Sequence, residues 1–379
     1  MKRVYFDNAA TTPLDEEVLE AMLPYMKSKF GNPSAVHGFG RETRAAIEKA
    51  RKTVANYLNC STGEIFFTSG GTESNNQAIK RSVYDLGVKH IITSTIEHHS
   101  VAHSCDFLEK DAGVKVHYVN LDELGRIDYY DLESKLTSID GTKLVSLMHA
   151  NNELGNVMDL QLVSELCEKY GTYLHSDTVQ TVAHFPIDLQ RTRLHFMSGS
   201  AHKFHGPKGE GFIYINSDVK INPTLHGGGQ ERNMRSGTEN VYGIVGLGKA
   251  VEIACDHKDG HRAHITDLKM YMAEQLQKNV PGVKFMGDWN GKCLYTVLSV
   301  CFPESDKSSM LLFNLDIDGI ACSAGSACAS GTSVGSHVIG QISPECAART
   351  IRFSFSKYNN REEVDYVVEK LKALFAVTV

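Results

Sequence analysis

The sequence has no hydrophobic run approaching the roughly 20 apolar residues that span a membrane. Its first residues, MKRVYFDNAATTP, do not contain the apolar core of a signal peptide. Only 9 of the 379 residues are proline and 22% are charged, so collagen-like and disordered chains are excluded. Positive charge is not in excess, because 39 Lys and Arg stand against 45 Asp and Glu, a net charge of −6. We therefore expect neither a membrane protein nor a nucleic-acid-binding protein.

Cysteine is present but is not arranged as in secreted or metal-binding domains. The 9 cysteines are an odd number, and no CxxC pair occurs. This usage predicts a cytoplasmic protein with reduced thiols. Six cysteines lie in predicted helices or strands and are expected to pack as small apolar side chains: Cys60, Cys105, Cys167, Cys255, Cys293 and Cys301. The pattern around Cys346 is uninformative.

Predicted strands and helices alternate from residue 43 to residue 256. Strands are expected at 64–69, 90–95, 114–120, 143–150, 173–177, 194–200 and 211–216. Alternation of this kind is typical of βα units and a mostly parallel sheet flanked by helices. From residue 258 the pattern changes to a long helix, two strands and a final amphipathic helix. We predict a large domain, 15–257, and a small α+β domain formed by 1–14 and 258–379.

Two of the predicted strands are followed by residues that suit a phosphorylated carbonyl cofactor. Gly70-Gly71-Thr72 follows strand 64–69 and is either a phosphate-binding turn at a helix N-terminus or a plain connection. Lys203 follows strand 194–200 and is either a snorkelling lysine or a Schiff-base lysine. In open sheets of this kind, ligands bind beyond the carboxyl ends of the strands.

Other strand ends supply what pyridoxal phosphate needs besides a phosphate cup and a lysine. Asp177 can keep the pyridine nitrogen protonated, which makes the ring an electron sink. His98 offers a flat ring for stacking, and Asn152 can hydrogen bond with the ring oxygen. These residues complement one another chemically, although each has a structural alternative when taken alone.

Ten motifs occur in the order found in one enzyme family: FDNAATTP, FGNPS, FTSGGTES, TIEHHSV, HANNELG, HSDTVQ, SGSAHKFHGPKG, GGGQERNMRSGTEN, SAGSACASG and IRFSFS. In these the chain resembles the cysteine desulfurases, which belong to the class V aminotransferase group of fold-type-I pyridoxal-phosphate enzymes. The SAGSAC sequence is similar to that of the NifS-like group. The resemblance covers about residues 5–357. It implies the α/β PLP-dependent transferase fold of type I and pyridoxal 5'-phosphate as cofactor.

The resemblance also implies a role for individual residues. Lys203 resembles the Schiff-base lysine, Asp177 the partner of the pyridine nitrogen, and His98 the stacking and proton-transfer histidine. Further residues of the same site resemble cofactor ligands: Gly71, Thr72, Asn152, Gln180, Ser200, His202 and, from the second subunit of a homodimer, Thr238. Arg352 resembles the clamp for the substrate carboxylate, with Asn152 assisting, because a planar guanidinium binds carboxylates in bidentate fashion.

Cys328 matches the nucleophile of the family. It lies in ACSAGSACASGTSVGS (321–336), where 12 of 16 residues are Gly, Ala or Ser, too few large side chains to anchor a core. Cys322 is six residues away, and we favour a structural role for it. The implied reaction takes sulfur from L-cysteine, leaves L-alanine and forms a persulfide on Cys328. An iron–sulfur scaffold, a thiolation enzyme or another carrier would accept that sulfur.

Three alternatives stay open at the level of sequence. A zinc hydrolase is suggested by His98, His99, His103 and Cys105, but the spacing HHxxxHxC matches no standard zinc signature, so no metal is expected. Another pyridoxal-phosphate reaction is possible, such as transamination or selenocysteine cleavage, because the fold does not choose the reaction. The third is a binding protein that has kept the fold without catalysis.

Overall fold

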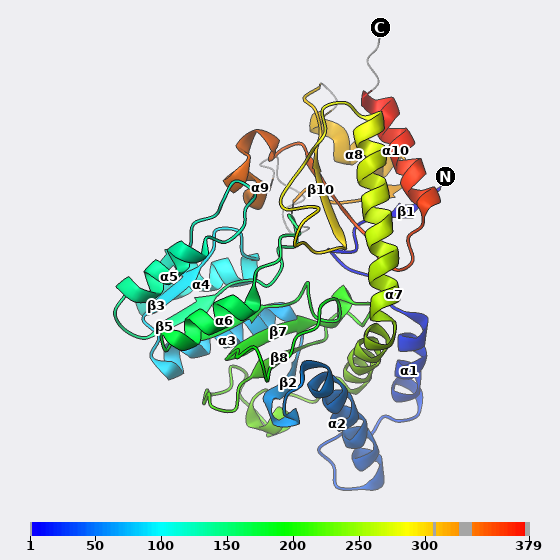
Figure 1. The fold of residues 1–379 in the computed structure, drawn as a ribbon. Helices are drawn as coiled ribbons and strands as arrows, with labels where there is room; N and C mark the ends of the chain where they lie inside the picture. The colour runs from blue at the N-terminus through cyan, green and yellow to red at the C-terminus, as the bar shows by residue number, and fades with distance from the viewer. Residues whose placement is uncertain (1, 306–307, 326–335, 376–379) are drawn as a thin grey trace.

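The computed structural model describes residues 2–305, 308–325 and 336–375. Its central sheet has seven strands in the order β2-β8-β7-β6-β5-β3-β4 (Figure 1). β8 is antiparallel to β2 and β7, and the other neighbouring pairs are parallel. The mostly parallel sheet predicted from the sequence is thus confirmed. The strands are β2 (Ile65–Thr68), β3 (His90–Thr93), β4 (Lys115–Tyr118), β5 (Lys143–Ser146), β6 (Tyr173–Asp177), β7 (Phe196–Ser200) and β8 (Gly211–Ile215).

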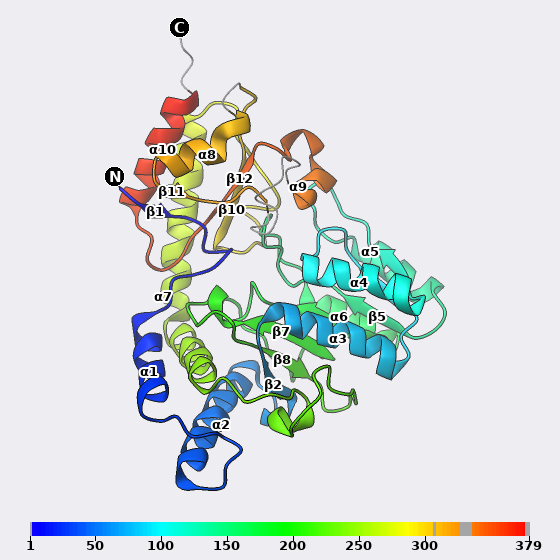
Figure 2. The same ribbon diagram turned by 180° about the vertical axis from the view of Figure 1, so that it is seen from behind.

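Helices cover both faces of this sheet (Figures 1 and 2). α3 (Gly71–Leu86) and α4 (His99–Ala112) bury apolar side chains against one face. α2 (Gly38–Leu58), α5 (Tyr129–Ser138), α6 (Leu160–Lys169) and the first half of α7 (Val241–Asn279) bury theirs against the other. α1 (Glu16–Lys27) packs beside α7. Apart from the edge strand β4, the strands are therefore buried on both faces, as is typical of parallel sheets.

A second, smaller layer surrounds the other half of α7. Its strands β9 (Lys284–Phe285), β10 (Val297–Cys301) and β12 (Thr350–Ser354) are antiparallel, and β1 (Val4–Tyr5) pairs with β11 (Ile320–Ala321). Its helices are α8 (Leu311–Ile317), α9 (His337–Ile342) and α10 (Arg361–Phe375). Its core is separate from that of the large sheet. The boundary at 257/258 stays a prediction, and α7 runs through it unbroken.

α7 begins 20 residues earlier than the helical pattern at 261–280 indicates. Its first turns contain Gly246 and Gly248, and glycine weakens a helix by about 1 kcal/mol per residue. Both positions need glycine for close packing. A Cβ at Gly248 would lie 2.8 Å from Cβ of Ala50, and one at Gly246 would lie 2.7 Å from Sδ of Met22. Tertiary contact therefore outweighs helix propensity here.

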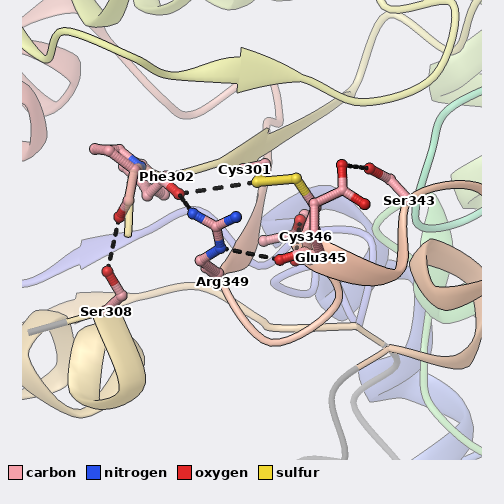
Figure 3. The surroundings of a disulfide bond; sticks show 9 residues. Cys301, Phe302, Ser308, Ser343, Glu345, Cys346 and Arg349 are labelled. Carbon is pink, nitrogen blue, oxygen red and sulfur yellow. Dashed lines mark hydrogen bonds between the residues drawn. A yellow bond between two sulfur atoms is a disulfide. The ribbon is translucent and has the colours of Figure 1, made fainter. Parts of the chain in front are cut away.

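A disulfide joins Cys301, at the end of β10, to Cys346, in the short 3₁₀ helix η6 (Pro344–Cys346) (Figure 3). β10 and β12 are antiparallel neighbours with Cys301 opposite Thr350, so η6 folds back over the end of β10. The two Cα atoms lie 5.6 Å apart. The expectation of reduced thiols is therefore wrong for this pair, and Cys301 is not simply a packing residue. The 45-residue separation left no local signal for the bridge.

The remaining cysteines of the described ranges divide by environment. Cys105 and Cys167 are buried in apolar clusters, as predicted, and Cys60 packs at the edge of one. Cys255 is exposed on α7, so the packing prediction is wrong for it. Cys293 is half-buried and donates a hydrogen bond to the carbonyl of Trp289. No helix within the described ranges is both long and apolar enough to cross a membrane.

Candidate active site

A cavity of about 250 Å³ opens at the carboxyl ends of the central strands, between the large sheet and β12. Ten of the residues singled out from the sequence line it: Gly71, Thr72, His98, Asn152, Asp177, Gln180, Ser200, His202, Lys203 and Arg352. They come from different loops and are brought together because parallel strands present their carboxyl ends at one edge. The structure thus assembles the predicted constellation, while the role of each residue stays a prediction.

One wall of the cavity is the N-terminus of α3. The helix begins at Gly71, and the preceding Gly70, with φ 144°, has no side-chain cap, so the first backbone N–H groups are available to an anion. A Cβ at Gly71 would lie 2.5 Å from Cγ2 of Val179, which leaves no room for a side chain. The hydroxyl of Ser200 faces the same turn, 3.4 Å from where a Gly70 Cβ would lie. Together they form a cradle of a shape that suits an anion.

Asp177 ends β6 and is 6% exposed. Its Oδ2 accepts a hydrogen bond from Nδ2 of Asn75 at 2.6 Å, and Oδ1 accepts one from the backbone N–H of Val179 at 3.0 Å. Oδ1 of Asn75 lies 3.2 Å from Nε2 of His175, whose pKa burial lowers to about 4. The carboxylate is thus held by neutral donors, and each oxygen keeps a lone pair for a further donor.

Lys203 ends the 3₁₀ helix η2 (Ala201–Lys203), which continues directly from β7. Its Nζ donates hydrogen bonds to the carbonyls of Ala9 at 2.6 Å and Ala10 at 2.9 Å. Gln180 Nε2 donates to the same Ala9 carbonyl at 3.1 Å. The turn at residues 8–10 therefore lines the cavity and orients the amine. A snorkelling lysine would instead direct its amine to bulk solvent.

Burial keeps the two histidines of the cavity neutral. It lowers the pKa of His98, with the Lys203 charge acting in the same direction. Nδ1 of His98 accepts the backbone N–H of Ser100 at 3.1 Å as the N-cap of α4, so the proton of the neutral ring lies on Nε2. Burial lowers the pKa of His202 to about 4, and its Nδ1 lies 3.2 Å from Oγ1 of Thr11.

Arg352 on β12 forms the opposite wall and is 2% exposed. Its Nη2 donates to Oδ1 of Asp7 at 2.9 Å, and its Nη1 donates to the carbonyl of Asn152 at 2.9 Å. Its Nε is buried and has no hydrogen-bond partner among the described residues. A buried guanidinium with an unused donor suits a carboxylate ligand.

Several residues of the site were not predicted from the sequence. Asp7, Ala9, Ala10, Asn75 and Ser100 all bond to predicted residues or line the cavity. Asn75 lies one turn of helix after Gly71, and that spacing would have placed it on the same side of α3. Asp7 carried no such signal, because its contact with Arg352 spans 345 residues.

Two of the predicted residues are not among the described residues that line the cavity. Thr238 is exposed and lines a separate cavity of about 60 Å³, so it takes no part in this chain's own site. Cys328 lies outside the described residues. Cys322 is half-buried against the apolar core of the small layer, and burial raises the pKa of its thiol.

The histidine-rich start of α4 was the basis for the zinc alternative. The rings of His99 and His103 lie 5.0 Å apart, and His99 lies 4.7 Å from His337 on α9. Within the described ranges, no group of three or more histidine, cysteine, aspartate or glutamate side chains is arranged to hold a metal ion.

A larger cavity of about 500 Å³ lies beside the first, at the ends of β3 and β5, and Met148 lines both. Its basic residues are already paired, Lys292 with Asp159 at 3.0 Å and Arg126 with Asp288 at 3.6 Å. It has no helix N-terminus formed by glycine and no amine comparable to that of Lys203. The chemistry therefore belongs to the smaller cavity.

Comparison with known proteins identifies the family. The profile of the class-V aminotransferases matches residues 4–367. The chain belongs to this family. It is 45% identical to "Cysteine desulfurase IscS" of Dictyoglomus turgidum, covering 99% of this chain and 95% of that protein. It is 43% identical to "Cysteine desulfurase IscS" of Methanosarcina thermophila, covering 97% of this chain and 91% of that protein.

Solved structures agree with this assignment. A structure named "NIFS-LIKE PROTEIN" superposes with a TM-score of 0.90 at 39% identity, covering 98% of this chain and 99% of that chain. A structure of "SspA in complex with cysteine" superposes with a TM-score of 0.81 at 33% identity, covering 94% of this chain and all of that chain. The type I fold of pyridoxal-phosphate-dependent transferases predicted from the motifs is confirmed.

Proposed function

We propose that this class-V aminotransferase family member is a cysteine desulfurase that uses pyridoxal 5'-phosphate. It converts L-cysteine into L-alanine and leaves the sulfur as a persulfide on Cys328. The observation that carries the proposal is a single cavity in which Lys203 and Asp177 lie between the N-terminus of α3 and the guanidinium of Arg352. Relatives named cysteine desulfurase, 45% and 43% identical over nearly the whole chain, support the choice of reaction.

The residues present fit the cofactor. The glycine cradle at Gly71 and the hydroxyl of Ser200 suit its phosphate, with Thr72 and His202 beside them. Asp177 suits the pyridine nitrogen, and Gln180 and Asn152 suit the ring oxygen. His98 would stack on the ring. When bound, the cofactor supplies an electron sink for the substrate's α-carbon and a carbonyl that condenses with amines.

The chain's own residues would carry the protons and the sulfur. Arg352 binds the substrate carboxylate and thereby fixes the α-carbon relative to Lys203. The Lys203 amine, oriented by the carbonyls of Ala9 and Ala10, takes the proton from the α-carbon and later returns it. The Cys328 thiolate attacks the substrate sulfur, so an S–S bond forms as the substrate C–S bond breaks. The β-carbon of the substrate keeps the electron pair of that bond and takes up the proton that the Cys328 thiol lost. The products are L-alanine and the persulfide, and no external oxidant or reductant is consumed.

The partners form part of the same proposal. We expect a homodimer in which Thr238 of each chain completes the phosphate site of the other, since Thr238 is exposed and does not line the active-site cavity of its own chain. An acceptor protein, either an iron–sulfur scaffold or a thiolation enzyme, would remove the sulfur from Cys328. The cytoplasmic location expected from the sequence stays a prediction.

One set of measurements tests cofactor, substrate and reaction together. The purified protein is mixed with pyridoxal phosphate, its absorbance spectrum is recorded, and alanine and sulfide are measured after L-cysteine and a thiol reductant are added. We expect a visible absorbance band and equal amounts of alanine and sulfide. C328A should keep the band and lose sulfide release. A protein that stays colourless, or a C328A variant with normal sulfide release, would refute the proposal.

A further inference from the structure

The turn that follows β5, residues 151–156, joins the edge of the large sheet to the strands of the small layer. The carbonyl of Asn152 accepts a hydrogen bond from Nη1 of Arg352 at 2.9 Å, and the carbonyl of the next residue accepts one from the hydroxyl of Ser299 on β10. Within the turn, Oδ1 of Asn151 accepts two backbone N–H groups at 2.8 Å. These bonds hold the turn in place, and its Asn152 carbonyl in turn holds the guanidinium of Arg352. We call residues 151–156 the platform.

The side chain of Glu153 extends from this platform to a different part of the small layer. It is 2% exposed, and its Oε2 accepts a hydrogen bond from the hydroxyl of Ser336. Ser336 is the N-cap of α9, and its Oγ accepts the backbone N–H of Ile339 at 3.0 Å. A Cβ at Gly325, where φ is 77°, would lie 3.0 Å from Cβ of Ser336 and 3.5 Å from Oε2 of Glu153. Glu153 therefore meets two residues, Gly325 and Ser336, that are far from it in the sequence.

Gly325 and Ser336 have a special place in the chain. They are the described residues that flank 326–335, the segment that contains Cys328. The described residues on either side of that segment therefore lie against one buried carboxylate, on the same turn that holds Arg352. We propose that Glu153 is a positioning residue for Cys328, which fixes the ends of its segment relative to the substrate carboxylate site. This inference rests on the proposed function.

The chemistry of the contact favours a positioning role over simple packing. A buried carboxylate is costly unless its oxygens are satisfied, and Oε1 of Glu153 has no hydrogen-bond partner among the described residues. An apolar pair would fill the space without that cost. An O–H···O⁻ bond is shorter and stronger than its neutral counterpart, so it fixes the start of α9 with more precision than a Gln–Ser pair would.

The test separates binding from sulfur transfer in the cofactor-loaded enzyme. E153Q and S336A should keep the cofactor absorbance and bind L-cysteine, followed by the spectral change, within about twofold of wild type. The single-turnover rate of persulfide formation on Cys328, followed by mass spectrometry, should fall about tenfold or more, since small displacements of reacting groups cost that much. The rate of Cys328 alkylation in the cofactor-free protein should change about threefold or more, because the ends of its segment are released.

Two further variants make the result specific. S336T keeps the hydroxyl and should restore persulfide formation to within about twofold of wild type, because a threonine N-cap makes the same bond. S61A removes the N-cap hydroxyl of the short helix η1 (Thr62–Glu64), away from the site, and should leave every rate unchanged.

Contrary outcomes are distinguishable. If wild type forms the persulfide and E153Q and S336A form it equally fast, the inference is wrong while the proposed function stands. The same conclusion follows if S336T is as slow as S336A. If wild type itself forms no persulfide on Cys328, the proposed function fails and the inference with it. If E153Q is unfolded by circular dichroism, the comparison of S336A with S336T decides.

Discussion

The cofactor cavity and the region around the ends of the Cys328 segment are assembled in different ways. In the cavity, each functional side chain of the large domain lies at the end of a strand or within a few residues after it. Asp177 is the last residue of β6, and Lys203 lies shortly after β7. In the second region, the contacts join residues far apart in the chain. Glu153 and Ser336 are 183 residues apart, and Cys301 and Cys346 are 45 apart.

This difference has a physical consequence for substitutions. The parallel sheet fixes the backbone of the cavity residues, so the fold does not depend mainly on their side chains. The second region is fixed by side-chain bonds, so changes there should alter stability or position first. Substitutions in the two regions should therefore separate loss of activity from loss of stability, and the following predictions test this in order of decreasing effect.

Lys203→Ala should have the largest effect, and mainly on activity. Loss of a positioned acid–base group lowers turnover by about 10²–10⁴-fold. Two backbone carbonyls lose a donor, so the free energy of unfolding should fall by only about 1 kcal/mol. Alanine production and urea unfolding of the same sample measure both. K208A, at an exposed lysine further along the same loop, is the control and should match wild type in activity and in stability. A K203A variant that keeps activity but unfolds easily would reverse the comparison.

The difference between local and long-range contacts also explains which features could be predicted from the sequence. Strand ends can be located from local patterns, and the parallel topology then brings them to one edge, so ten of the predicted site residues line one cavity. The ten ordered motifs added roles that no local pattern implies. The final helix, α10, was also predicted, since an amphipathic pattern can be detected locally.

The failures have the opposite origin. The Cys301–Cys346 bridge depends on β10 and β12 being neighbours, which no local pattern reports. The contact of Asp7 with Arg352 depends on the N-terminal segment returning to the small layer. The first turns of α7 were missed because their glycines are chosen for contact with Ala50 and Met22 rather than for helix propensity.

Removal of the disulfide should have the second-largest effect, and on stability. The bridge closes residues 301–346 into a covalent loop, so the double variant C301S/C346S should lose about 2–4 kcal/mol of unfolding free energy. Urea midpoints with and without dithiothreitol measure this, and the reductant should lower the wild-type midpoint but not that of the variant. C255S, at an exposed free thiol, should leave the midpoint unchanged. Cofactor absorbance should be normal in all three proteins.

A wild-type midpoint that dithiothreitol leaves unchanged would contradict this prediction. It would also remove one of the long-range contacts on which the comparison depends. Arg349, which donates to the carbonyls of Glu345 at 3.0 Å and Phe302 at 3.2 Å beside the bridge, would then join the two segments together with the backbone bonds between β10 and β12 (Figure 3).

His202→Gln should have the smallest effect, and in the cofactor-free protein it should appear as a pH dependence of stability. Burial lowers the pKa of His202 to about 4, so the unfolded chain binds a proton below pH 6.5 while the folded one stays neutral. Its contribution to stability is complete above pH 6.5 and is lost as the pH falls toward 4. In the cofactor-free protein, wild type should therefore lose up to about 2 kcal/mol more than H202Q between pH 7 and pH 5, measured by urea unfolding.

The cofactor-loaded enzyme sharpens this last comparison. If His202 lies against the cofactor's phosphate, the anion raises the pKa of the imidazole, and the extra loss of stability in wild type at pH 5 should shrink once the cofactor is bound. An extra loss of the same size with and without cofactor would place the phosphate elsewhere in the cavity. Gly71 and Ser200 would then form the anion site without His202, and the His202 side chain would have only a structural role.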